Sequence, residues 1–293
     1  MGEFKLDYLS NLTANRANEL SLVLSAMGIP HSVIEESDKN FSLKVEKGFE
    51  DRAIEEIRLY EEENKRNITR GYLKPANQGF NPFIFSMTIA FFALLFVFQS
   101  FLYSLDYYKL FLEIGNASSQ DILKGEIWRC VTSITLHVDL GHFLSNAFIG
   151  SLILYFLFCD SGIGIGLFFF LLSGFLGNLS GAFIHPQEFH SVGASGAIFG
   201  AFGILTALRI IEARNIQKKS FFVQVGSAIA FLSLFGLEEF SDVTGHILGL
   251  LCGFILGFAL QQVIKWKENK ALQFISGFLS IVVIILSWIK ALY

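Results

Sequence analysis

Seven long stretches of the chain contain no aspartate, glutamate, lysine or arginine. They span residues 75–105, 140–159, 161–187, 189–208, 220–237, 243–264 and 271–289. A helix needs about 20 apolar residues to cross the roughly 30 Å hydrocarbon core of a bilayer. All seven runs are near that length, and the fifth is the shortest. They predict an all-α polytopic membrane protein with seven spans, the third ending near Ile184 because His185-Pro186 follows.

The charged residues gather at the start of the chain. Of the 293 residues, 53% are hydrophobic and 16% charged, whereas soluble domains are about a quarter charged. Residues 1–74 hold 14 acidic and 11 basic side chains, about half of the charge. Helical periodicity over Arg16–Met27 and Phe49–Asn64 flanks two strands, Ser32–Glu36 and Phe41–Glu46. We expect a small α/β domain at 1–74, a six-span core at 75–264 and a seventh helix at 265–293.

Lysine and arginine distribution predicts the orientation, because these residues gather on the cytoplasmic side. Four precede the first span, four lie between the fourth and fifth, and three lie between the sixth and seventh. The N-terminal domain is therefore expected in the cytoplasm and the C-terminus outside. No signal peptide, targeting segment or paired cysteine motif is evident, so a bacterial inner membrane without disulfides is expected.

Polar residues then fall at one predicted depth. Even-numbered spans start outside, so His142 and Asn146 open the second, Ser195 opens the fourth and His246 opens the sixth. Ser195 could merely bond a carbonyl, and with Gly196 and Gly200 it could form a close-packing face. His246 could likewise be satisfied by a carbonyl. Together they suggest a nucleophile and its base, because ionisable groups in spans are usually functional.

The remaining polar residues admit several roles. His142 and Asn146 lie four apart on one helical face and could donate to an oxyanion. A metal site is not expected, because HExxH is absent and no carboxylate accompanies the histidines. Asp242 could orient His246, although a helix cap is the commoner role for an aspartate there.

These residues resemble the rhomboid intramembrane serine proteases. The shared motifs are His137-x4-His142-x3-Asn146, Gly193-Ala194-Ser195-Gly196, Gly245-His246-x-x-Gly249, and Trp128-Arg129 in the first external loop. The resemblance covers residues 82–262 in matching order and implies Ser195 as nucleophile and His246 as general base. It implies that His142, Asn146 and the Ser195 backbone N–H form the oxyanion hole. It also implies that loop 106–140 lies partly in the outer leaflet.

One position departs from the family pattern. Phe199 stands where many members carry tyrosine. A phenyl ring could still pack on His246, without the hydroxyl. We expect this to adjust the rate rather than abolish activity.

The predicted function is a serine endopeptidase that cuts transmembrane segments of other proteins near their external end. Its partners would be membrane-protein substrates and lipids, with no cofactor, metal or nucleic acid. One alternative is a non-catalytic escort of membrane proteins, although such relatives typically lack the serine or histidine. Another is a proton-coupled transporter, which would favour a paired carboxylate, and the seven runs contain none.

Overall fold

A computed structural model describes residues 10, 12–37, 40–69, 80–187, 189–213, 226–227, 230–231 and 242–293. The chain divides into two compact units, Met1–Pro75 and Ala76–Tyr293. Each unit is described by itself below.

The first unit is a two-stranded hairpin with two helices. Its elements are α2 (Ala14–Ala26), β1 (His31–Ser37), β2 (Asn40–Val45) and α3 (Glu50–Thr69). The Thr13 side chain caps α2, and Gly28, with φ of +65°, lets the chain turn into β1. The core consists of Leu20, Leu24, Ile29, Leu43, Ala53 and Ile57. Met27, the last residue of the predicted helix, follows the last turn of α2 and is 46% exposed.

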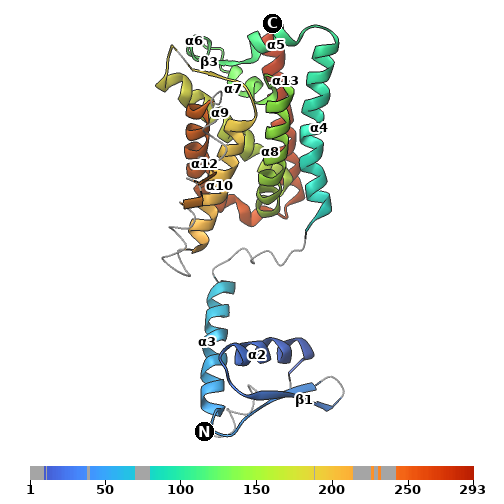
Figure 1. Ribbon diagram of the computed structural model, residues 1–293, viewed down its shortest axis with the longest axis vertical. Helices are drawn as coiled ribbons and strands as arrows, with labels where there is room; N and C mark the ends of the chain where they lie inside the picture. The colour runs from blue at the N-terminus through green and yellow to red at the C-terminus, as the bar shows by residue number, and fades with distance from the viewer. Residues whose placement is uncertain are drawn as a thin grey trace. The chain divides into compact units, whose positions relative to one another are not determined.

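The long helices described in the second unit run alongside one another (Figure 1). They are α4 (Pro82–Ser104), α8 (Leu140–Ser161), α9 (Ile163–Ile184), α10 (Ser195–Ala213), α12 (Val243–Val263) and α13 (Lys270–Leu292). Five are long and apolar enough to cross a membrane, and α10 has a shorter apolar stretch. The predicted fifth span, 220–237, lies outside the described residues except for 226–227 and 230–231. The second unit is therefore an all-α polytopic membrane bundle, and α9 ends at Ile184 as predicted.

Side chains close the N-termini of four of these helices. Asn81, Asp139, Asp242 and Asn269 each accept a hydrogen bond from a backbone N–H in the first turn. This matters because an unpaired backbone group in hydrocarbon costs several kcal/mol. For Asp242, the structure agrees with the capping role that the sequence favoured.

Helix α8 extends beyond the charge-free run that predicted it. It continues to Ser161 and so contains Asp160, whose carboxylate lies 2.6 Å from the Arg209 guanidinium on α10. The expectation that no acidic residue lies within a span is therefore wrong. The ion pair with Arg209 balances the charge of the Asp160 carboxylate within the helix. Asp160 lies 18 residues beyond His142, about 27 Å along the helix axis.

Helices α10 and α12 approach so closely that their backbones touch. A Cβ added to Gly249 would lie 2.1 Å from the Gly196 carbonyl oxygen, and one on Gly253 would lie 1.9 Å from that of Gly200. Side chains at these two positions would separate the helices. The close-packing face predicted at Gly196 and Gly200 therefore does pack, against glycines of α12.

The connection between α4 and α8 is folded into short elements. They are α5 (Tyr108–Gly115), β3 (Ala117–Ser118), α6 (Ser119–Leu123), α7 (Arg129–Thr132) and η1 (Ser133–Thr135). Strand β3 pairs with β4 (His190–Ser191), which immediately precedes α10. The connection is thereby tied to the segment that leads into Ser195. Figure 1 shows α5, α6, α7 and β3 at the end of the bundle where the C-terminus lies.

Helix α13 is anchored to the turn between α8 and α9 by one side chain. The Gln273 oxygen accepts from the N–H groups of Gly164 and Ile165, at 2.8 and 3.1 Å. Its amide nitrogen donates to the carbonyls of Ser161 and Lys267. The 3-10 turn η2 (Ile264–Trp266) and residues up to Asn269 connect α12 to α13.

Candidate active site

Ser195 is the first residue of α10 and follows a tightly held turn. Gly193 has φ of +126°, a conformation that favours glycine, and its N–H donates to the Ser133 carbonyl at 2.9 Å. A Cβ at this position would also lie 2.7 Å from Cε1 of His142. Gly193 is therefore required by both conformation and space, and it holds the start of α10 beside His142.

His246 lies in the first turn of α12 and is 4% exposed. Its Nε2 is 2.8 Å from Oγ of Ser195. Asp242 sits one turn earlier, where its side chain accepts from the Gly245 N–H at 2.7 Å. The close packing of α10 on α12 thus brings together the two residues that the sequence predicted to share a proton.

Phe199 packs flat on the His246 ring. The ring centroids are 4.5 Å apart and the planes differ by 24°. The stack forms without a tyrosine hydroxyl, as the sequence suggested it could. On its other side Phe199 contacts Phe231, one of the described residues within the predicted fifth span.

His142 and His137 lie beside the turn that precedes Ser195. Their ring centroids are 5.4 Å apart. His137 is fully buried, with Nδ1 2.8 Å from the Gln99 amide nitrogen and Nε2 3.4 Å from the Ala194 N–H. Burial, with a smaller effect from nearby His142, lowers the pKa of His137 to about 3. His137 is therefore neutral at physiological pH and supports the turn without carrying charge.

Asn146 lies one turn below His142 on α8. Its Nδ2 donates to the His142 carbonyl at 2.8 Å. Its buried Oδ1 has no hydrogen-bond partner among the described residues. An amide nitrogen carries two hydrogens, so one N–H of Asn146 remains for another acceptor.

The other predicted residues differ in their relation to Ser195. A Cβ on Gly196 would meet only the Gly245 oxygen, at 3.6 Å, so this glycine is less tightly enclosed than Gly249. Arg129 binds the Glu126 carboxylate at 2.6 Å and the Glu113 and Asn116 carbonyls. It therefore fastens the first loop. Trp128, beside it, lines a separate cavity described below.

Three supporting residues were not predicted from the sequence. They are Gln99, which contacts His137, Ser133, whose carbonyl binds Gly193, and Asn178, whose amide donates to Cys130 and Ser133. For Gln99 and Asn178, the available sequence signal was an amide side chain within an apolar run. Within the described ranges, no group of three or more His, Cys, Asp or Glu could hold a metal.

Comparisons with known proteins identify the family that the chain resembles. The family model of the Rhomboid domain matches residues 124–263. The rhomboid protein YdcA of Bacillus subtilis is 32% identical over 144 residues, which cover 48% of this chain and 71% of YdcA. Rhomboid protease GluP of Bacillus subtilis is 32% identical over 157 residues, or 50% of this chain and 28% of GluP.

An inactive protein is also among the relatives. Inactive rhomboid protein 2 of Homo sapiens is 27% identical over 146 residues, which cover 49% of this chain and 17% of its own length. Similarity to the family alone therefore does not decide activity.

Proposed function

The chain belongs to the rhomboid family, and we propose that it is an intramembrane serine endopeptidase with Ser195 as nucleophile and His246 as general base. The observation that supports this most directly is the 2.8 Å separation of Ser195 Oγ from His246 Nε2. That distance permits direct proton transfer between a hydroxyl and a neutral imidazole. The glycine-lined contact of α10 with α12 holds the two residues at this distance.

In the proposed reaction, His246 accepts the Ser195 proton as Oγ attacks the carbonyl carbon of the substrate. The resulting imidazolium donates that proton to the leaving amine, and an acyl-enzyme remains. Water then attacks the ester, with His246 again acting as base. Stacking on Phe199 favours the productive orientation of the imidazole during both steps.

Three donors are suited to the oxyanion of the tetrahedral intermediate. They are the Ser195 backbone N–H, the His142 ring, which lies beside Gly193, and the second amide hydrogen of Asn146. A preorganised donor of this kind contributes about 10²–10³-fold to the rate. The bond from Asn146 to the His142 carbonyl fixes the amide relative to the first turn of α8.

The proposed substrates are transmembrane segments of other proteins, cleaved near their external end. Ser195 and His246 both lie in the first turn of their helices, and the proposed orientation places those turns near the outer surface. A substrate helix must unwind locally to expose its amide, since a helical carbonyl is hydrogen-bonded. The proposed location is a bacterial inner membrane, with the N-terminal unit in the cytoplasm.

The test is cleavage of a purified transmembrane reporter by the wild type and by Ser195→Ala and His246→Ala. Loss of the nucleophile should abolish cleavage, and loss of the base should lower the rate about 10²–10⁴-fold. A matched control is Ser173→Ala, because the buried Ser173 hydroxyl bonds only its own helix, to the Phe170 carbonyl. Undiminished cleavage by the Ser195 variant would contradict the mechanism.

A second readout separates the protease from the non-catalytic escort. A fluorophosphonate probe should label Ser195 in the wild type and not in His246→Ala. Folded protein that neither cleaves the reporter nor reacts with the probe would favour the escort, in keeping with the inactive relative.

A further inference from the structure

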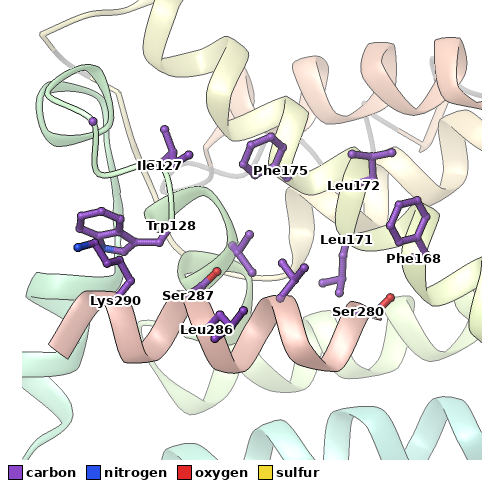
Figure 2. Close-up of a pocket in the computed structure, with 13 residues that line it drawn as sticks. Ile127, Trp128, Phe168, Leu171, Leu172, Phe175, Ser280, Leu286, Ser287 and Lys290 are labelled. Carbon is purple, nitrogen blue, oxygen red and sulfur yellow. The ribbon is translucent and has the colours of Figure 1, made fainter. Parts of the chain in front are cut away.

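A second cavity lies away from the serine–histidine pair, between the first loop, α9 and α13 (Figure 2). Its volume is about 640 Å³, within the range of sites that enclose a small molecule. The walls are mainly apolar, with Phe168, Leu171 and Phe175 from α9 opposite Val283 and Leu286 from α13. Neither Ser195 nor His246 lines it.

The two ends of this cavity differ in chemistry. Figure 2 shows Trp128 and Lys290 together at one end, while Phe168 and Ser280 lie toward the other. The Lys290 ammonium is 5.5 Å from the centroid of the Trp128 ring. Throughout the described ranges, no carboxylate forms an ion pair with Lys290. This end therefore carries a positive charge that no described acid neutralises.

Trp128 adds an unused donor at the same end. Its indole Nε1 is buried and has no hydrogen-bond partner within the described part of the chain. Buried tryptophan nitrogens usually find an acceptor, because an unpaired donor loses its hydration without compensation. The Lys290 ammonium, held over the Trp128 ring, is the group at this end that is suited to a phosphate oxygen.

The length of the cavity matches half a bilayer. Lys290 and Ser280 are ten residues apart on α13, which corresponds to about 15 Å along the helix. The hydrocarbon core is roughly 30 Å thick, so one leaflet contributes about the same length. Tryptophan and lysine also favour the headgroup level, where Lys290 lies near the end of α13.

We propose that this cavity binds an anionic phospholipid, with one acyl chain along the α9–α13 groove and the phosphate at Lys290, beside the Trp128 ring. The apolar walls suit the chain, and the charged end suits the headgroup. The site joins α13 to the first loop next to Arg129, so a bound lipid would strengthen that contact. It does not depend on whether Ser195 is catalytic.

The test uses nanodiscs with equal amounts of phosphatidylglycerol and phosphatidylcholine, followed by native mass spectrometry of the released protein. The wild type should retain one phosphatidylglycerol in preference to phosphatidylcholine. Lys290→Gln should lower that preference about fivefold, the effect of one lysine near a charged lipid surface. Trp128→Phe, which keeps the ring and removes the N–H, should lower it less.

Two further variants make the result specific. Lys270→Gln removes the same charge from the opposite end of α13 and should leave the preference unchanged. Val283→Phe should fill the groove and exclude the acyl chain without changing the charge; thermal unfolding and circular dichroism would verify its fold. Equal losses in both lysine variants, or lipid retained by folded Val283→Phe, would overturn the proposal. So would a wild-type dimer that occupies the groove and is lost in Val283→Phe.

Discussion

At the level of single residues, the His246 ring depends on its apolar neighbour. Phe199 covers one face of the imidazole, and the imidazole has its Nε2 directed at Ser195. Packing by Phe199, which lacks a tyrosine hydroxyl, therefore helps to hold the His246 ring beside Ser195. Substitutions at position 199 can therefore separate the role of the aromatic ring from the role of a tyrosine hydroxyl.

We predict that Phe199→Leu lowers the cleavage rate up to about tenfold, because aromatic stacking contributes about 0.5–1.5 kcal/mol. Phe199→Tyr keeps the ring and should retain most activity. Phe202→Leu is the control, since Phe202 lies in the same helix as Phe199 and stacks on Phe231. Initial rates on the transmembrane reporter provide the measurement. If the Phe199 and Phe202 leucine variants behave alike, the stack on His246 has no special role.

The serine, the histidines and Asn146 could be found from the sequence because each is polar where an apolar span begins. Their supports could not be assigned in this way. The contact of Gln99 with His137 joins residues 38 positions apart, and the bond from Gly193 to Ser133 involves only backbone atoms. Such partners depend on tertiary packing, which no local pattern encodes.

At the level of helices, α10 and α12 form one unit. Their glycines allow carbonyl oxygens of one helix to touch the backbone of the other, so the distance from Ser195 to His246 is set by backbone contact. The spacing of Gly196 and Gly200 predicted the face on α10. It did not distinguish the glycines that are sterically required from those that are not.

We predict that Gly253→Ala destabilises the bundle by about 1–3 kcal/mol, the usual cost of overpacking, and lowers cleavage. The added methyl would lie 1.9 Å from the Gly200 oxygen, which belongs to the backbone and cannot rotate away. Gly196→Ala is the contrast, since its methyl would be 3.6 Å from the nearest atom. Thermal unfolding in detergent compares the two. Equal shifts would argue against backbone contact as the determinant.

The charge-free runs located the helices but not all of their ends. A charge-free run ends before Asp160 by definition. Helix α8 nevertheless continues to Ser161, and the Asp160 carboxylate within it pairs with Arg209. The short elements of the first loop also escaped prediction. The β3–β4 pair contains two residues on each strand and joins segments more than 70 positions apart.

At the level of the whole molecule, the unequal distribution of lysine and arginine predicts the orientation. We expect a membrane-impermeant maleimide to label Tyr293→Cys in intact cells and Glu268→Cys only after the membrane is opened. Both positions are exposed and lie at opposite ends of α13, in a background with the three native cysteines replaced by serine. The reverse labelling pattern would invert the proposed topology and place Ser195 near the cytoplasm.

The Gln273 anchor has a consequence for biosynthesis. Ser195 and His246 both precede α13 in the chain, and Gln273 of α13 supplies an acceptor for the N–H groups of Gly164 and Ile165 at the start of α9. A nascent chain that stops before Lys270 would contain Ser195 and His246 and would lack the Gln273 acceptor for those two amides. The contacts that close the start of α9 therefore await the synthesis of α13.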